Sequence, residues 1–349
     1  MEITIPSLLR IKPKALNKVG KYLRHENFSN IALFLGEGIK ELFFEKIAIS
    51  LDSSEIKIVH EEIINSNDIN EIFKSSLSLP KRTEAVLAIG GGKALDFCKY
   101  VAFINQLPLV VVPTIISNDA FCSPFSSLLI DGKRKTVKTA IPHGIIVDTE
   151  IISNSPPSFI FSGIGDLFCK ATSLFDWKLA FAKTHERIDD FAKVITQQSL
   201  DTFYYYENKD IKNLEFLRIL TSSLLMSGIA MLIAKSSRPA SGSEHLISHA
   251  YDRIAAKPSL HGLQVGVASY AVSFLQVETY EKVKNMLIES KFLDFMTQNP
   301  LNKADFQEAI KLAPSIKDDY YTILSEKNNI ERLLQFLDED ELINKMLIG

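Results

Sequence analysis

The sequence is poor in cysteine and tryptophan and has no marked excess of charge of either sign. Its 349 residues include three cysteines and one tryptophan, and 39 Lys and Arg stand against 42 Asp and Glu. Three cysteines in so long a chain form no disulfide framework, which favours a reducing, cytoplasmic setting. The basic excess that nucleic-acid binding normally needs is lacking. We therefore expect a cytoplasmic protein that binds no nucleic acid.

Long apolar runs are also scarce. The longest uncharged stretch, Ile219–Ala234, contains serine, threonine and glycine and falls short of the roughly 20 residues of a membrane span. The opening residues MEITIPSLLRIKPK carry several charges and do not fit a signal peptide. We expect a helix buried in a protein core and no membrane insertion.

The first 155 residues differ in pattern from the rest. Short apolar runs alternate there with amphipathic segments, which predicts a parallel sheet covered on both faces. The expected strands are residues 31–35, 55–59, 85–89, 109–112 and 145–147, and the expected helices are residues 37–50, 68–78 and 93–105. After Pro156 nearly all of the pattern is helical. The sequence predicts a Rossmann-like α/β domain over residues 1–155 and an all-α domain over residues 156–349, in keeping with a length that exceeds one core.

A glycine-rich turn follows the expected strand at residues 85–89. Gly90-Gly91-Gly92-Lys93 leads straight into the helical pattern of residues 93–105. Glycines let backbone N–H groups approach an anion, and a helix N-terminus adds partial positive charge. The turn matches neither the spaced dinucleotide fingerprint nor the P-loop, so a tight turn without a ligand stays an alternative. Its place at the carboxyl end of a parallel strand favours a nucleotide.

Three segments of the helical half carry side chains suited to a divalent cation. Asp166, His245 and His261 supply one carboxylate and two imidazoles, the ligand set of a catalytic zinc with an open position. His245 and His249, at i and i+4, form a second possible pair. Hydrogen-bonded structural histidines are the alternative.

Five motifs together resemble the glycerol-1-phosphate dehydrogenases, a branch of the superfamily that includes glycerol dehydrogenase, iron-containing alcohol dehydrogenases and dehydroquinate synthase. They are GGGKALD, PTIISNDAFCSP, SGIGDLFCKATSLFDWKLA, RPASGSEHLISHAYD and HGLQVGV, in that order. The resemblance implies a dehydroquinate synthase-like fold and interconversion of glycerol 1-phosphate and dihydroxyacetone phosphate. It also implies NAD or NADP, a zinc ion or another divalent metal such as Fe or Ni, and a homo-oligomer acting on a small molecule.

Site residues carry over from the resemblance position by position. It implies that Asp166, His245 and His261 hold the metal and that Asp119 lies beside the nicotinamide and the substrate. Because oxidation of an alcohol releases a proton that must reach solvent, Asp119 and His249 are the catalytic candidates for its relay. The resemblance also implies that Gly90, Gly91, Gly92 and Lys93 hold the cofactor pyrophosphate. Further expected cofactor contacts are Gly36, Glu37, Asp96, Thr114, Ser117 and Ser123.

Recognition of a substrate phosphate requires cations, and the loop around Asp119 departs from the family pattern. Asn118 and Ala120 stand where histidine and glycine are expected, and Phe125 stands where arginine is expected. Lys170 and Arg238 are the nearest candidate phosphate ligands, with a solvated lysine and a structural arginine as the alternatives.

Other functions and the choice of nucleotide stay open. The alternatives are a glycerol or other polyol dehydrogenase, a metal-dependent sugar-phosphate cyclase and a non-catalytic relative. Glu37 just past a strand end favours NAD if its carboxylate reaches a ribose hydroxyl, whereas an acid in the first turn of the next helix carries no such preference.

Overall fold

The computed structural model describes residues 5–349, which divide into two compact units. Unit 1 runs to Ser155 and also includes Ile211–Gly228, and unit 2 consists of Pro156–Asp210 and Ile229–Gly349. The sequence pattern places Ile211–Gly228 in the helical domain, but its contacts place this segment with the α/β unit. Long-range packing of a helix is not visible in hydrophobic periodicity, which explains the difference.

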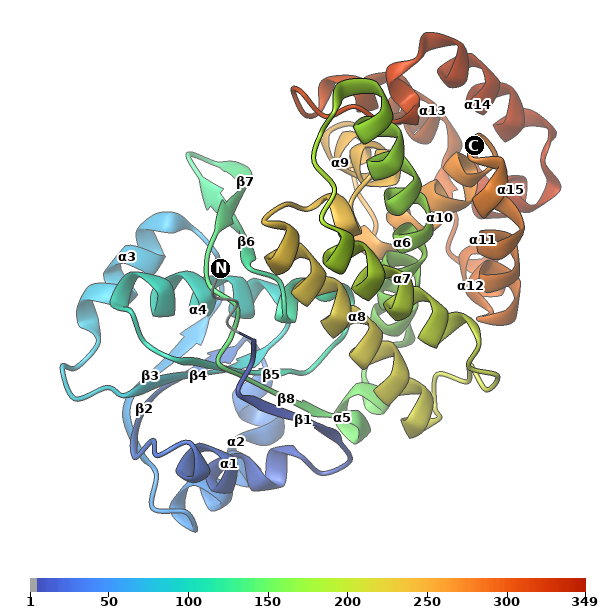
Figure 1. The fold of residues 1–349 in the computed structure, drawn as a ribbon. Coiled ribbons are helices and arrows are strands. Elements are labelled where there is room, and N and C mark those ends of the chain that lie inside the picture. Colours follow the sequence, from blue (N-terminus) through green and yellow to red (C-terminus); the bar gives the residue numbers. More distant parts are fainter. Residues whose placement is uncertain (1–4) are drawn as a thin grey trace. The chain divides into compact units, whose positions relative to one another are not determined.

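Unit 1 is built on a six-stranded parallel sheet (Figure 1). In spatial order its strands are β1 (Leu8–Lys12), β8 (Gly144–Asp148), β5 (Leu109–Pro113), β4 (Ala85–Gly90), β2 (Asn30–Gly36) and β3 (Lys57–Ile64). The central strands β2, β4, β5 and β8 are almost wholly buried, as expected for a sheet covered on both faces. The predicted parallel α/β architecture is confirmed, with the edge strand β1 as an addition.

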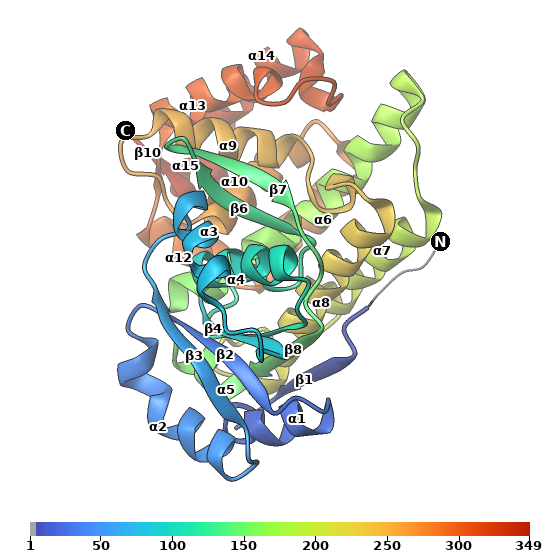
Figure 2. The same cartoon turned by 90° about the vertical axis from the view of Figure 1, so that its left-hand side faces the viewer.

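Helices cover the two faces of this sheet (Figures 1 and 2). On one face lie α1 (Val19–His25) and α2 (Ile39–Asp52), and on the other lie α3 (Ile69–Ser78) and α4 (Gly92–Asn105). Unit 1 also contains α5 (Thr149–Asn154), the 3-10 turns η1 (Leu16–Lys18) and η2 (Asp119–Phe121), and the hairpin of β6 (Phe125–Ile130) and β7 (Lys133–Lys138).

The direction of chain progression reverses between β2 and β4. From β2 the chain first adds β3 on one side, and β4, β5 and β8 then follow on the other. Such a switch point leaves a crevice at the carboxyl ends of the two central strands, where open α/β sheets bind ligands. Gly36 and Gly90 end these strands so close together that a Cβ on Gly36 would lie 3.4 Å from the Gly90 Cα. The fold therefore places the glycine turn at its expected ligand-binding position.

Unit 2 is almost entirely helical, as predicted. Its α-helices are α6 (Pro157–Thr184), α7 (Asp190–Tyr204), α9 (Ser243–Ile254), α10 (His261–Ser273), α11 (Val277–Glu289), α12 (Phe292–Gln298), α13 (Lys303–Leu312), α14 (Lys327–Glu339) and α15 (Glu341–Met346). Its short elements are η3 (Arg238–Ala240), η4 (Ala313–Ser315), η5 (Ile323–Ser325), β9 (Leu301–Asn302) and β10 (Leu347–Ile348).

Helices α6 and α10 approach closely because glycines lie where they touch. A Cβ on Gly165 would lie 2.1 Å from the Gly262 carbonyl oxygen, and a Cβ on Gly262 would lie 1.9 Å from the Ser162 carbonyl oxygen. Both clashes are with backbone, so any side chain at these positions would push the helices apart. This contact places Asp166, which follows Gly165, beside His261, which precedes Gly262.

Helix α8 (Leu214–Ala234) is longer than the uncharged stretch within it. By length and composition this helix could cross a membrane. The shortness of its uncharged stretch therefore does not by itself exclude a membrane span. However, 67% of its most apolar window is buried inside the folded chain. Such burial is typical of a core helix, the interpretation that the sequence favours.

Candidate functional site

Unit 2 brings together the three residues that the sequence singles out as metal ligands. Asp166 lies on α6, His245 in the first turn of α9, and His261 at the start of α10. Asp166 Oδ1 lies 3.8 Å from His245 Nε2 and 4.0 Å from His261 Nε2. The Asp166 side chain is 2% exposed, whereas the side chains of His245 and His261 are 12% and 28% exposed. Two imidazole nitrogens thus face one buried carboxylate oxygen, and both histidine side chains are partly exposed.

The second nitrogen of each histidine has a protein partner. His245 Nδ1 lies 3.0 Å from Glu244 Oε1, and His261 Nδ1 lies 3.0 Å from Ser248 Oγ. Metal-binding histidines characteristically hold their other ring nitrogen in such a contact, because it fixes the ring orientation and the tautomer. The donor set and its support therefore fit a divalent cation bound through Nε2, Nε2 and a carboxylate oxygen. The sequence alone did not identify Glu244 or Ser248, which are an adjacent acid and an unremarkable helix serine.

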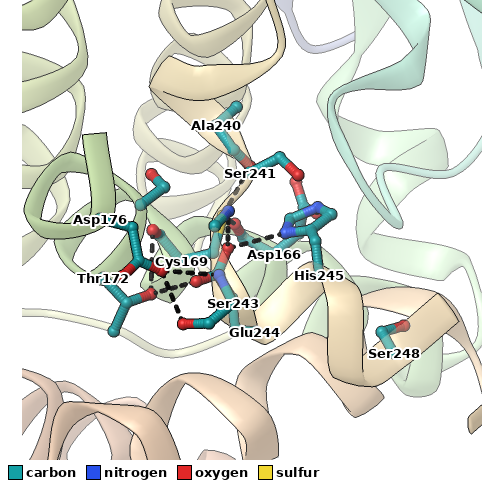
Figure 3. Close-up of polar contacts among 12 residues, drawn as sticks. Asp166, Cys169, Thr172, Asp176, Ala240, Ser241, Ser243, Glu244, His245 and Ser248 are labelled. Atoms are coloured by element: carbon teal, nitrogen blue, oxygen red, sulfur yellow. Dashed lines mark hydrogen bonds and ion pairs between the residues drawn. The ribbon is translucent and has the colours of Figure 1, made fainter. Parts of the chain in front are cut away.

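A second buried carboxylate fixes the start of α9 (Figure 3). Asp176 Oδ2 accepts hydrogen bonds from the Ser243 backbone N–H at 2.7 Å and the Ser243 hydroxyl at 2.6 Å. Glu244 accepts from Thr172 Oγ1 at 2.8 Å and from the Gly242 N–H at 2.6 Å. Burial and the nearby charge of Glu244 raise the pKa of Asp176 to about 7. Helix α6 thus supplies both a candidate ligand, Asp166, and groups that position the start of α9, which carries His245.

His249 lies one turn beyond His245 on α9 and is exposed. Its ring stacks on that of His261 at a centroid distance of 5.6 Å and lies 6.2 Å from that of His245. His249, Asp252 and His261 form another group with metal-binding atoms within 4.8 Å of one another, and so do Cys169, Glu244 and His245. Among the described residues, no such group contains both His245 and His249, the i, i+4 pair considered from the sequence.

The two candidate phosphate ligands differ in their surroundings. Lys170 is fully buried on α6, where its Nζ lies 3.5 Å from Asp166 Oδ2 and 3.3 Å from Cys169 Sγ. The alternative of a solvated helix lysine is therefore wrong. Its ammonium group is therefore a buried neighbour of the Asp166 carboxylate, one of the candidate metal ligands.

Arg238 is also fully buried, but its donors are engaged elsewhere. Its Nε donates to Glu186 Oε1 at 2.8 Å, its Nη2 to Glu186 Oε2, and its Nη1 to the Tyr321 carbonyl at 2.8 Å. Its guanidinium carbon lies 3.5 Å from the centre of the Tyr320 ring. These contacts fit the alternative of an arginine with a structural role. Arg238 is therefore not proposed as a phosphate ligand.

In unit 1 the glycine turn has the geometry of a helix N-terminal anion site. Gly91 caps α4 with φ −87° and ψ 179°, and Gly92 begins the helix. A Cβ on Gly91 would lie 2.9 Å from the Ile115 Cδ1, whereas one on Gly92 would meet no atom within 4 Å. The exposed Lys93 Nζ donates to the Asn65 carbonyl at 3.4 Å. Backbone N–H groups at the first turn of α4 can therefore point to an anion.

Asp96 differs from the other expected cofactor contacts because protein groups engage its carboxylate. Lys99 Nζ lies 2.8 Å from Asp96 Oδ1, and the Ser127 N–H donates to Oδ2 at 3.2 Å. Burial raises the pKa of Asp96 despite Lys99. Lys99 Nζ also donates to the Ala120 carbonyl at 2.8 Å. Asp96 is better explained as a support for the loop after β5 than as a direct cofactor ligand.

The remaining expected cofactor residues lie on and after β5. The Thr114 N–H donates to the Gly90 carbonyl at 3.0 Å, which joins the end of β5 to the glycine turn. Ser123 is buried, and its Oγ accepts from the Phe125 N–H at 3.2 Å. Ser117 is partly exposed. Asp119 Oδ2, the candidate relay group, accepts from Ser227 Oγ at 2.7 Å.

Glu37 is exposed in the turn between β2 and α2. Helix α2 begins only at Ile39, after Gly38 at φ 74°, and its first-turn acid is Glu41. The alternative of a first-turn acid is therefore wrong for Glu37. Its place at the carboxyl end of a switch-point strand fits contact with a cofactor ribose.

Comparisons with known proteins identify the class and then the family. A family model for iron-containing alcohol dehydrogenase matches residues 10–156. A glycerol-1-phosphate dehydrogenase [NAD(P)+] of Nitrosopumilus maritimus is 31% identical over 94% of this chain and 93% of the relative. The enzyme of the same name from Methanococcus maripaludis is 31% identical over 98% of this chain and 100% of the relative. The chain therefore belongs to the glycerol-1-phosphate dehydrogenase family.

Solved structures agree on the fold. A glycerol dehydrogenase from Schizosaccharomyces pombe matches with a TM-score of 0.77 and 19% identity, covering 99% of this chain and 91% of that one. A sulfoacetaldehyde reductase from Bifidobacterium kashiwanohense in complex with NAD+ matches with a TM-score of 0.73 and 14% identity, covering 97% and 99%. The predicted fold class, an α/β part and a helical part of this superfamily, is confirmed.

Proposed function

We propose that this chain is a metal- and NAD(P)-dependent glycerol-1-phosphate dehydrogenase. It interconverts glycerol 1-phosphate and NAD(P)+ with dihydroxyacetone phosphate, NAD(P)H and a proton. The relatives that align over nearly the whole chain carry this name. The observation that carries the proposal is the cluster of Asp166, His245 and His261, whose ligand atoms face one another in a chain of this family.

Three residues would hold the metal, for which we propose zinc. A mixed set of two imidazoles and a carboxylate suits zinc and leaves a coordination position for substrate. The bound ion supplies a Lewis acid that stabilises negative charge on the reacting oxygen. Asp166 and its neighbours keep one side of this position dry, because Asp166, Lys170 and Glu244 are fully or almost fully buried.

The glycine turn would bind the cofactor pyrophosphate. Gly91 and Gly92 bring main-chain N–H groups to the end of β4, and Gly36 allows β2 and β4 to approach at the switch point. Lys93 and Glu37 are exposed at the same end of the sheet and are proposed to contact phosphate and ribose, respectively. Thr114, Ser117 and Ser123 are proposed to contact the cofactor further along the β5 loop.

The proton released when the alcohol is oxidised must leave through this chain's own groups. His249 is exposed and stacks on His261, so it lies between the metal cluster and solvent. Asp119, held by Ser227, is the second candidate for this relay. Lys170 is the proposed partner of the substrate phosphate, because its buried ammonium group lies next to Asp166.

Glycerol dehydrogenase activity is the second candidate. It is favoured by the engagement of Arg238 in a buried ion pair and by Asn118, Ala120 and Phe125 in the loop around Asp119. A substrate panel separates the two functions. We expect NAD(P)H oxidation with dihydroxyacetone phosphate at a kcat/KM far above that with dihydroxyacetone. A preference for the unphosphorylated ketone would assign the chain to the second function.

We also propose a cytoplasmic homo-oligomer. The three cysteines are buried thiols that form no disulfide among the described residues, as in a reducing compartment. Phe73 and Leu77, one helical turn apart on α3, are 47% and 89% exposed, which supports burial against another copy. Light scattering of the purified protein should give a mass that is a multiple of 39.2 kDa, and a monomer would contradict this part of the proposal.

A further inference from the structure

A chain of hydrogen bonds runs from His261 through two buried side chains to Asp252. Ser248 Oγ lies 3.0 Å from His261 Nδ1 and 2.7 Å from Gln264 Oε1. Gln264 Nε2 lies 3.1 Å from Asp252 Oδ1 and 3.0 Å from the Ser259 carbonyl oxygen. Ser248 and Gln264 are 1% and 0% exposed, so water cannot readily replace these partners.

The chemistry of the groups fixes the direction of every proton in this chain. A carboxylate and a carbonyl oxygen only accept, so the NH₂ group of Gln264 must face Asp252 and Ser259. Its Oε1 therefore faces Ser248 and also only accepts. The single hydroxyl proton of Ser248 must go to this oxygen, which leaves Ser248 Oγ as an acceptor toward His261.

We propose that Gln264 and Ser248 are positioning residues that hold His261 as the Nδ1–H tautomer, in which Nε2 is the unprotonated nitrogen that can bind a metal. This inference rests on the proposed role of His261 as a metal ligand. The tautomer follows because Nδ1 must donate the remaining hydrogen bond to Ser248. The Nε2 atom of this tautomer is the one that faces Asp166 Oδ1.

The two histidines of the metal cluster are thus held by different means. Glu244 contacts His245 Nδ1 directly with a buried carboxylate, whereas His261 Nδ1 contacts the neutral hydroxyl of Ser248, which in turn contacts the neutral amide of Gln264. If the amide of Gln264 is removed, the Ser248 hydroxyl is free to donate to His261 Nδ1. The imidazole proton then moves to Nε2, where it competes with the metal.

Metal affinity of the full-length protein tests this proposal. Zinc binding is measured by competition with a chelator in wild type, Gln264→Leu, Ser248→Ala and the control Ser269→Ala. Ser269 also lies on α10 and is 0% exposed, and its hydroxyl has no hydrogen-bond partner among the described residues. We expect zinc affinity to fall about 10- to 100-fold in the first two variants and less than about twofold in the control.

The tautomer itself can be read without metal. With ¹⁵N-labelled histidine near pH 8.5, about two units above the ordinary histidine pKa, long-range ¹⁵N–¹H spectra distinguish Nδ1–H from Nε2–H. We expect His261 to be Nδ1–H in wild type and in the control Ser269→Ala, and to gain Nε2–H in Gln264→Leu. An Nε2–H imidazole in wild type, or no change in Gln264→Leu, would overturn the proposal.

The outcomes also separate this inference from the proposed function. If His261→Ala binds zinc as tightly as wild type, the metal site itself is assigned wrongly. If His261→Ala loses zinc while Gln264→Leu and Ser248→Ala match the control, the metal site stands and only the positioning chain is refuted.

Discussion

The glycine turn of unit 1 and the metal cluster of unit 2 are built in opposite ways. The turn relies on backbone and on missing side chains, since Gly36, Gly90 and Gly91 leave room at the ends of two strands. The cluster relies on side chains, and each of its histidines has a further side chain behind it. The first site is therefore sensitive to added atoms, whereas the second is sensitive both to removed side chains and to a side chain added at Gly165 or Gly262.

The largest effect is expected from deleting a metal ligand. His261→Ala removes one of three ligand atoms, so turnover should be abolished and metal content should fall sharply, while NAD(P) affinity stays within about twofold of wild type. Metal analysis, steady-state kinetics and nucleotide titration measure the three quantities. His25→Ala, whose side chain is 78% exposed in wild type, is the control and should change none of them. Full metal occupancy and activity in His261→Ala would refute the ligand assignment.

The second largest effects are expected at two buried cationic residues of unit 2, Lys170 and Arg238. Lys170→Met should lower kcat/KM for dihydroxyacetone phosphate about 10- to 100-fold and affect dihydroxyacetone far less, because a charge-assisted hydrogen bond contributes about 1.5 to 3 kcal/mol. Arg238→Met should lower kcat/KM equally for both ketones. It should also reduce the free energy of unfolding by about 3 kcal/mol, since it leaves the Glu186 partner unpaired. Equal losses on both ketones in Lys170→Met would make Lys170 a support of Asp166 instead.

A side chain added in the glycine turn of unit 1 should disrupt cofactor binding. Gly91→Val should weaken NAD(P) binding by more than about tenfold, equivalent to about 1.4 kcal/mol, because the side chain fills space needed by the pyrophosphate. The free protein should fold, since the new Cβ meets only the Ile115 side chain and no backbone atom within 4 Å. Nucleotide titration and circular dichroism measure both outcomes, and metal content should stay normal. Unchanged affinity in a folded variant would refute the phosphate site at Gly91.

The smallest effect is expected at Glu37. Its exposed carboxylate repels a 2′-phosphate and accepts from a ribose 2′-hydroxyl, so Glu37→Ala should shift the ratio of NAD to NADP efficiency toward NADP by about tenfold or less. Kinetics with both cofactors give this ratio. A wild-type preference for NADP that survives the substitution would remove Glu37 from cofactor recognition.

Local patterns predicted much of this molecule. Apolar runs identified β2, β4, β5 and β8, and the glycine turn could be found because a strand, three glycines and a helix are contiguous in the sequence. The cluster of Asp166, His245 and His261 was predicted from residue type and family motif. The fold then brings these three together through the glycine contact of α6 with α10.

Features that depend on long-range packing could not be predicted. The sequence alone does not show that Arg238 forms an ion pair with Glu186 or that Asp96 forms one with Lys99. Ser248 and Gln264 look like ordinary helix residues until α9 and α10 are packed together. The same reason explains why residues 211–228 join unit 1 although their pattern is helical.

The central claim is that one metal centre in unit 2 makes this chain a glycerol-1-phosphate dehydrogenase. Its most direct test is to strip the enzyme with a chelator, add zinc in steps, and follow NAD(P)H oxidation by dihydroxyacetone phosphate. We expect no activity without metal, and a rate of NAD(P)H oxidation that rises linearly with added zinc and levels off at about one zinc per chain. Full activity in the stripped enzyme, or no turnover of dihydroxyacetone phosphate at any zinc level, would contradict it.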